Sequence, residues 1–249
     1  MKAMIVAAGL GTRLRPLTDT LPKALVPVAG VPMLERVILR LKEAGFTDIT
    51  VNIHHLGGQI IDFLHAHHSF GVTLHLSDER GALLDTGGGI RHARRFLDGD
   101  EPFLVHNVDV ITDLDLRTFY LRHRQSAADA TLFVNHRHTS RCLLADAGGR
   151  LCGWTNRSTG EVLPADLVYP DARYRAEAFG CVQVLSPSLF RYMDEAQLPD
   201  RFSIIPFYVS ICRTARIQTC AADSRYWFDI GKPETLAAAE AYLSAHGHA

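Results

Sequence analysis

The stretch AAGLGTRLRPLT, residues 7–18, directly follows the apolar run MKAMIV at residues 1–6. The apolar run predicts a buried β-strand, so glycines and arginines stand where that strand should end. The segment is not a dinucleotide-binding fingerprint, because Leu14 takes the third glycine position of G-x-G-x-x-G, and a P-loop motif is also absent. The sequence therefore predicts a glycine turn of another kind after the first strand.

This turn has the chemistry to hold a polyanion. Backbone N–H groups of a glycine turn can approach phosphate oxygens closely, and Arg13 is a planar donor suited to bidentate phosphate contact. Lys23, ten residues after Arg13, supplies a second cation on the same connection. A solvated turn with surface arginines remains the alternative interpretation of the loop alone.

Strands and helices alternate through the first half of the chain. After the first strand, helices are predicted at 32–45, 57–67 and 88–97, and strands at 48–53, 72–76 and 102–109. Such βα units predict an α/β protein with a Rossmann-like, mostly parallel central sheet and helices on both faces. Ligands of these sheets bind at the carboxyl ends of the strands, where the glycine turn and Asp109 are both expected.

The second half of the chain is less regular. Strand patterns occupy 130–136, 141–156 and 176–186, and helical patterns occupy 188–193, 203–213 and 233–245. No low-complexity linker and no internal repeat interrupts the chain. We therefore expect a single domain, residues 1–249, with an inserted or appended mixed sheet.

Composition limits the partners. The chain has 249 residues, 47% of them hydrophobic, and a formal net charge of -1, so we expect a small ligand and neither nucleic acid nor a membrane surface as partner. No apolar run approaches the roughly 20 residues needed to span a bilayer, and we expect a cytoplasmic protein. The five cysteines include no C-x-x-C, which argues against a disulfide framework and predicts reduced thiols.

The opening loop also carries a family resemblance. The run A-A-G-L-G-T-R-L-x-P-L-T followed by P-K-A-L-V-P-V-A-G-x-P resembles the signature of sugar-1-phosphate nucleotidylyltransferases. Further matches are LLDTGGGI at 83–90, HNVD at 106–109 and YWFDIGKPE at 226–234. Within the family, the chain is most similar to short uridylyltransferases acting on N-acetylmuramate 1-phosphate, followed by mannose-1-phosphate guanylyltransferases.

The resemblance implies a fold and a reaction. It implies a single-domain nucleotidyltransferase fold, monomeric or homodimeric, with a nucleotide-binding half at 1–112 and a sugar-phosphate-binding half at 113–249. A sugar-1-phosphate oxygen would attack the α-phosphorus of a nucleoside triphosphate, and pyrophosphate would leave. No general base is required, since a phosphate monoester has a second pKa of about 6, and catalysis reduces to alignment and charge neutralisation.

Several functions stay open at this point. UTP is the favoured triphosphate, because LLDTGGGI resembles the uridylyltransferase members more than the guanylyltransferases. The alternatives are a GTP-using mannose-1-phosphate guanylyltransferase, a cytidylyltransferase of a phosphorylated alcohol, and a non-catalytic nucleotide-sugar binding protein.

The resemblance assigns roles to single residues. Arg13 would contact the leaving pyrophosphate, and Lys23 would bridge the two reacting phosphates. Asp109, a catalytic residue, would hold Mg²⁺ together with Asp229, since this hard cation takes carboxylate and phosphate oxygens. The residues expected to hold the triphosphate are Ala8, Gly9, Gly11, Thr12 and Arg13.

Base selection is expected in the segment SDERGALLDTGGGI, residues 77–90. Backbone groups at Thr86, Gly87 and Gly88 would read the edge of the base, with Asp78 or Glu79 nearby. The alternative is that the glycines only let a helix pack closely on the sheet.

Four residues are expected to contact the sugar: Asn107, Asn156, Gly180 and Cys181. Many family members read N-G-D where this chain has Val108, so a side chain is expected close to the sugar and should narrow its pocket. Cys181 stands where relatives commonly place a glycine. Trp227 could stack on a base or sugar, although an aromatic residue on a strand is more often part of the core.

Overall fold

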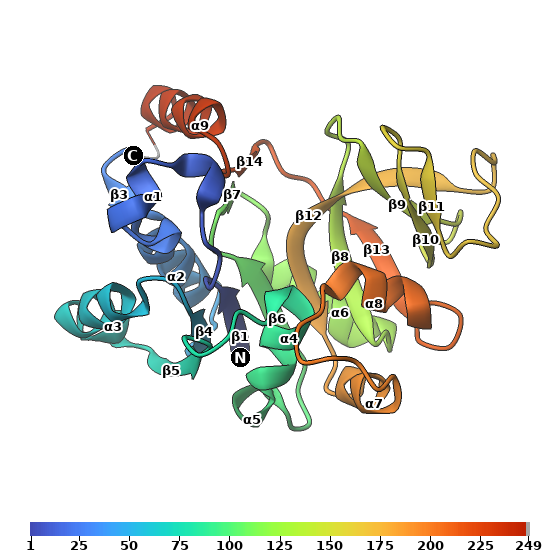
Figure 1. Cartoon of the computed structure of the whole chain (residues 1–249), viewed down its shortest axis with the longest axis horizontal. Helices are drawn as coiled ribbons and strands as arrows, with labels where there is room; N and C mark the ends of the chain where they lie inside the picture. The colour runs from blue at the N-terminus through green and yellow to red at the C-terminus, as the bar shows by residue number, and fades with distance from the viewer. Residues whose placement is uncertain (248–249) are drawn as a thin grey trace.

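Four parallel strands form the centre of the protein, as the alternation predicted. The computed structural model describes residues 1–247 (Figure 1). The strands are β1 (Lys2–Val6), β4 (Asp48–Ile53), β5 (Thr73–Asp78) and β6 (Phe103–Asn107). β1 lies between β4 and β6, and β4 pairs with β5, all in parallel. The carboxyl ends of these strands therefore meet at one edge, which receives the glycine turn and Asp109.

The strands of the second half extend the same sheet. They are β8 (Ala130–Asn135), β9 (Arg141–Ala145), β10 (Leu151–Asn156), β11 (Glu161–Leu163), β12 (Arg175–Leu185) and β13 (Ile217–Ala221). The long strand β12 pairs antiparallel with β6, β8 and β9, so within residues 1–247 the sheet has ten strands. The mixed part expected from the sequence is thus continuous with the parallel part, because β12 belongs to both.

Two small antiparallel pairs accompany the main sheet. One joins β2 (Pro27–Val28) to β3 (Val31–Pro32), directly after the phosphate-binding loop expected from the sequence. The other joins β7 (Val110–Thr112) to β14 (Trp227–Asp229). This second pair brings the end of the chain back to the strand that follows Asp109.

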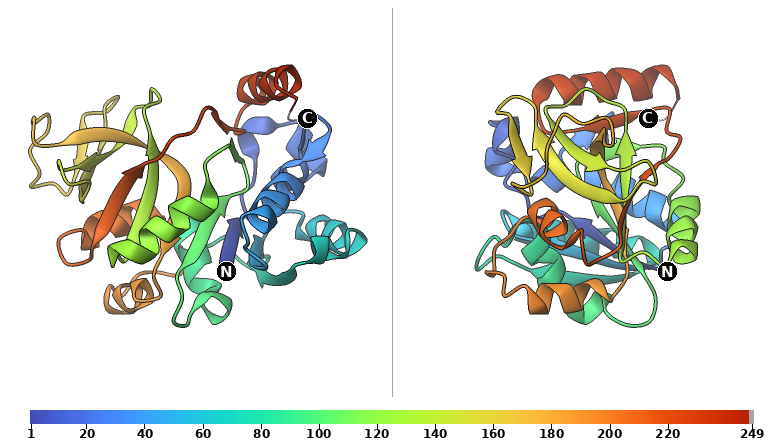
Figure 2. Two further views of the ribbon diagram at one scale, coloured as in Figure 1. Left: turned by 180° about the vertical axis from the view of Figure 1, so that it is seen from behind. Right: turned by 90° about the vertical axis from the view of Figure 1, so that its right-hand side faces the viewer.

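Helices cover both faces of the sheet (Figure 2). One core lies under α2 (Met33–Glu43), α3 (Gly57–Ala66), α6 (Leu116–Ser126) and α9 (Pro233–Ala245). The other lies under α4 (Asp85–His92), α5 (Arg94–Leu97), α7 (Leu189–Glu195) and α8 (Ile204–Ile211). The shorter helical turns are η1 (Thr12–Leu14), α1 (Leu17–Thr20), η2 (Lys23–Leu25) and η3 (His68–Gly71). None of the helices within residues 1–247 combines the length and apolar character that crossing a bilayer requires.

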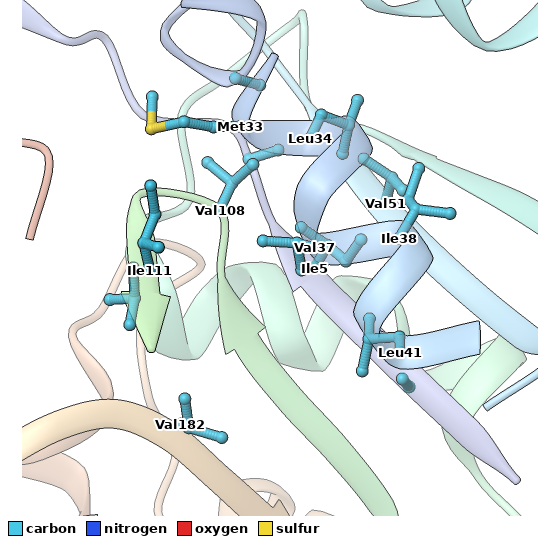
Figure 3. Close-up of a cluster of buried hydrophobic side chains, with 14 of the residues drawn as sticks. Ile5, Met33, Leu34, Val37, Ile38, Leu41, Val51, Val108, Ile111 and Val182 are labelled. Atoms are coloured by element: carbon cyan, nitrogen blue, oxygen red, sulfur yellow. The ribbon is translucent and has the colours of Figure 1, made fainter. Parts of the chain in front are cut away.

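The side chain of Val108 is buried in the first of these two cores. Ile5 and Val51 of the sheet lie there against apolar residues of α2 such as Val37 and Leu41 (Figure 3). Val108 is 3% exposed and belongs to this cluster. Its N–H donates to the carbonyl of Val6, so its backbone continues the parallel pairing beyond β6. The expectation that Val108 narrows a sugar pocket is therefore wrong, because its side chain is part of the core.

None of the five cysteines forms a disulfide in the structure.

Candidate active site

A cavity of about 350 Å³ lies beside the glycine turn. Residues for which the sequence predicts a role in binding phosphate or in catalysis line one side: Ala8, Gly9, Gly11, Thr12, Arg13 and Lys23. The structure thus brings the whole expected phosphate loop to a single cavity.

Two glycines of this loop differ in their surroundings. Gly11 has a φ of +67°, and a Cβ there would lie 2.8 Å from Thr18 Cγ2 and 3.1 Å from Lys23 Cβ. Thr18 Oγ1 donates to the Gly11 carbonyl at 2.8 Å and closes the turn. Gly9 has open space around its Cα, which leaves its backbone accessible from the cavity. The loop is therefore tight at one glycine and open at the other.

The two aspartates expected to hold the metal lie next to each other. Val110 pairs with Asp229 across β7 and β14, and the Ile230 N–H donates to the Asp109 carbonyl at 2.8 Å. Lys23, whose side chain is nearly buried, forms an ion pair with the Asp109 carboxylate. One cation and two carboxylates from distant parts of the chain thus meet beside the phosphate loop.

The charge of Asp229 is poorly compensated. Its Oδ1 is buried and has no hydrogen-bond partner. Burial raises the pKa of Asp229, and the charge of Asp109 raises it further, while Lys23 and Arg13 act in the opposite direction. A Cβ at Gly231 would lie 2.6 Å from Arg13 Nη2 and 2.9 Å from Asp229 Oδ1, so only glycine lets both groups occupy this place.

These residues fit a divalent cation. A buried carboxylate oxygen without a partner, next to a second carboxylate, is a donor set that a hard cation prefers. Within residues 1–247, no group of three or more His, Cys, Asp or Glu side chains is arranged to hold a metal. Two carboxylates are enough for Mg²⁺, which usually takes its remaining ligands from water and substrate phosphates.

Asn52 and Glu79 tie the strand ends together below the cavity. The Ala7 N–H donates to Asn52 Oδ1 at 2.6 Å, and Asn52 Nδ2 donates to Glu79 Oε1 at 2.7 Å. Glu79 is 2% exposed, and burial raises its pKa. Both residues line the cavity. Sequence reasoning missed Asn52, although a polar residue near the end of the apolar strand DITVNI was a visible signal.

In the segment expected to read the base, two of the expected backbone donors are already hydrogen-bonded within the protein. Thr86, Gly87 and Gly88 lie inside α4, and the N–H groups of Gly87 and Gly88 donate to the Phe202 carbonyl at 2.9 and 3.1 Å. Thr86 lines the cavity, but its Oγ1 accepts the Ile204 N–H. The two glycine N–H groups are therefore not available to a base, and that part of the expectation is wrong.

Close packing explains these glycines instead. A Cβ at Gly87 would lie 2.3 Å from the Phe202 ring, and one at Gly88 would lie 2.2 Å from the Asp200 carbonyl oxygen. The alternative that these glycines allow close packing is thus correct. At these two glycines, however, the helix packs against the segment before α8 and not against the sheet. The same segment brings Arg201 to the cavity, a residue that no sequence spacing pointed to.

Asp78 does not line this cavity. Its carboxylate is half exposed and forms an ion pair with Arg80 at 2.6 Å. Of the two acids expected near the base, only Glu79 reaches the cavity, because Asp78 and Glu79 are consecutive residues at the end of β5 and their side chains diverge.

The four residues expected at the sugar are not brought together as a group. The Gly180 carbonyl accepts the Trp227 indole N–H at 2.9 Å. Cys181 has a φ of +57°, and burial together with the charge of Asp109 raises the pKa of its thiol to about 12. Asn156 accepts the Ser158 N–H in the hairpin after β10, and Asn107 ends β6 outside the lining of the cavity. Gly180 and Cys181 therefore lie toward the aspartates, whereas Asn156 serves a turn.

The fold and this site define a nucleotidyltransferase. Residues 2–141 match the family model described as nucleotidyl transferase, and the chain belongs to this family. Members of the family generally depend on a divalent metal.

Two relatives have the same name. The N-acetylmuramate alpha-1-phosphate uridylyltransferase of Caulobacter vibrioides is 33% identical over 250 residues, which cover 97% of this chain and 96% of the relative. The protein of that name from Neisseria meningitidis is 52% identical over 115 residues, 46% of this chain and 49% of the relative. Its match is thus confined to about half of either protein.

A solved structure supports the fold across the whole chain. The UDP-glucose pyrophosphorylase from Acinetobacter baumanii superposes with a TM-score of 0.77 at 18% identity, covering 98% of this chain and 93% of that one. At this identity the likeness concerns the fold alone.

Proposed function

We propose that the protein transfers a uridylyl group from UTP to N-acetylmuramate 1-phosphate and releases pyrophosphate. The observation that carries the proposal is the cluster of Lys23, Asp109 and Asp229 beside the phosphate loop. The names of the two relatives support the choice of base and sugar. Because the reaction consumes a nucleoside triphosphate, we place it in the cytoplasm.

The chemistry needs alignment more than proton transfer. An oxygen of the sugar 1-phosphate forms a bond to the α-phosphorus of UTP, and the bond from that phosphorus to the bridging oxygen of pyrophosphate breaks. Arg13 and the N–H groups of the loop stabilise the leaving pyrophosphate. Lys23 exchanges its contact with Asp109 for one with the reacting phosphates, where a preorganised charge contributes most. A Mg²⁺ ion held by Asp109 and Asp229 would neutralise phosphate charge and orient the triphosphate.

A substrate panel tests the proposal. UTP, GTP, dTTP, CTP and ATP are each combined with N-acetylmuramate 1-phosphate, N-acetylglucosamine 1-phosphate, mannose 1-phosphate and choline phosphate, and pyrophosphate release is measured. The highest kcat/KM is expected with UTP and N-acetylmuramate 1-phosphate, and Asp109→Asn is the inactive control. A purine nucleotide would leave hydrogen-bonding groups of a uracil site unpaired, and each unpaired group should weaken its binding free energy by about 1 to 3 kcal/mol.

Other results would identify the alternatives. The best rate with GTP and mannose 1-phosphate would show a guanylyltransferase, and the best rate with CTP and choline phosphate a cytidylyltransferase. Nucleotide binding without pyrophosphate release in any combination would show a binding protein.

A further inference from the structure

A second cavity borders Asp229 and carries the further inference. It has a volume of about 350 Å³, and its lining includes Asn135, Arg137, Ser224, Trp227, Asp229 and Thr235. Gly231, two residues beyond Asp229, lines the first cavity beside Arg13. The linings of the two cavities share no residue, but both cavities border the segment 229–231. An acceptor whose phosphate lies at Asp229 can extend its sugar into the second cavity.

Arg137 is held in this cavity by neutral groups. Its guanidinium lies over the Trp227 ring, with Cζ 4.0 Å from the ring centroid. Nη1 donates to Asn135 Oδ1 at 3.0 Å, and Nη2 donates to the Phe179 carbonyl at 2.8 Å. Trp227 is itself fixed by the bond from its indole N–H to Gly180. The cation is thus preorganised by stacking and by two hydrogen bonds.

In the part of the chain that the structure describes, Arg137 forms no ion pair with a protein carboxylate, although the charge of Asp229 acts on it from further away. Among residues 1–247, the ion pairs within 4.0 Å include none that involves Arg137. Asp229 lines the same cavity, yet its Oδ1 makes no hydrogen bond to the guanidinium. A guanidinium has five N–H donors, and the two bonds above use only two of them. A half-buried cation with spare donors at a cavity is a receptor for an anion.

We propose that Arg137 binds a carboxylate on the sugar and selects acidic sugar 1-phosphates over neutral ones. This inference rests on the proposed function and adds the residue that determines acceptor specificity. The phosphate of the acceptor is accounted for by Lys23 and by the Mg²⁺ ion that the two aspartates would hold, so the anion at Arg137 is a second one. The lactyl ether of N-acetylmuramate bears such a carboxylate, and N-acetylglucosamine lacks it.

A purely structural role of Arg137 predicts something different. If the guanidinium only offset the negative charge of Asp109 and Asp229, its removal would lower the rates with both sugars by the same factor. If Arg137 binds the carboxylate, its removal lowers kcat/KM for the acidic sugar more than for the neutral sugar. The additional loss is an increase in KM for the acidic sugar.

The experiment compares two acceptors that differ only in the lactyl group. Wild type, Arg137→Met and Arg137→Lys are assayed with UTP and either N-acetylmuramate 1-phosphate or N-acetylglucosamine 1-phosphate. Arg122→Met, on the exposed face of α6, is the matched control for loss of a surface arginine. Arg137→Met should lower kcat/KM for the acidic sugar by about 10- to 150-fold more than for the neutral sugar, the range expected for a hydrogen bond to a charged group.

The outcomes separate the two proposals. Arg137→Lys keeps the charge and most of the stem, so it should retain part of the preference, and it serves as the folded variant should Arg137→Met not fold. Equal losses for both sugars, or a wild type without preference for the acidic one, would overturn the inference and leave the uridylyl transfer standing. No pyrophosphate release from wild type with either sugar would overturn the proposed function together with the inference.

Discussion

Lys23 forms an ion pair with Asp109 although the two residues are 86 positions apart in the sequence. The contact joins the phosphate loop after β1 to the carboxylate after β6. In the absence of substrate the site is therefore partly self-neutralised. Phosphates and a divalent cation that enter together can replace this contact without leaving either charge unpaired.

The cations of the phosphate loop should be essential for turnover. We expect Arg13→Ala and Lys23→Ala each to lower kcat by about 10²-fold or more, the cost of removing one preorganised contact to developing charge. Arg15→Ala is the control, because Arg15 is exposed and pairs with Asp19 in the same loop. Steady-state pyrophosphate release measures the effect, and near-normal rates in both variants would exclude the phosphate-loop assignment.

The aspartates should bind the metal as a pair. Asp109→Asn and Asp229→Asn should each abolish Mg²⁺-dependent activity, because the amide keeps the shape but loses the charge. Without Mg²⁺, Asp229→Asn should melt at a higher temperature than wild type, since it removes repulsion from Asp109 at a buried oxygen. Addition of Mg²⁺ should stabilise wild type and not this variant. An unchanged melting temperature of wild type across a Mg²⁺ titration would contradict this site.

Two helical glycines should respond in opposite directions to alanine. Gly88→Ala gains about 1 kcal/mol of helix propensity but places a methyl group against the Asp200 carbonyl, an overpacking that costs about 1 to 3 kcal/mol. Gly58→Ala in α3 meets no atom within 4 Å and should only gain stability. Thermal unfolding should therefore show a lower melting temperature for Gly88→Ala and a higher one for Gly58→Ala. A stabilised Gly88→Ala would disprove the docking of 200–202 on α4.

The stability of the fold should fall in mild acid. Burial lowers the pKa of His123 from 6.5 to about 4, and its ring nitrogens contact Thr131 Oγ1 and Ser186 Oγ. Between these two values the unfolded chain binds the extra proton. The contribution of His123 to the free energy of unfolding is therefore fully present above about pH 6.5 and decreases by up to about 3 kcal/mol as the pH falls to 4.

Urea unfolding at pH 7 and pH 5 measures this effect. His123→Gln should show a smaller loss of stability between the two pH values than wild type. His65→Gln is the control, since His65 is exposed on α3. An equal pH dependence in wild type and His123→Gln would contradict the buried neutral histidine.

Local patterns in the sequence predicted the elements of the first half and the turn after the first strand, but they left α6 and β13 unassigned. Hydrophobic periodicity placed β1, β4 and α2 close to their observed bounds, because a strand or helix must turn its apolar side chains to a core whatever lies elsewhere. The rule that parallel strands carry ligands at their carboxyl ends then placed Gly11 and Asp109 at one edge. The resemblance of YWFDIGKPE placed Asp229 there as well.

The direction of single side chains and the contacts between distant segments depended on the tertiary structure. Val108 follows the same strand as Asp109, but its pairing with Val6 turns it into the core. The glycines of α4 leave room for Phe202, so the segment 200–202 packs on this helix and places Arg201 at the cavity. This packing joins two segments that are more than a hundred positions apart. Periodicity describes which face of an element is buried, whereas the partner on that face is decided only when the chain packs. For that reason the sequence determined the glycine loop and the two aspartates, and the tertiary structure alone decided what lines the rest of the cavity and where Arg137 and Trp227 meet.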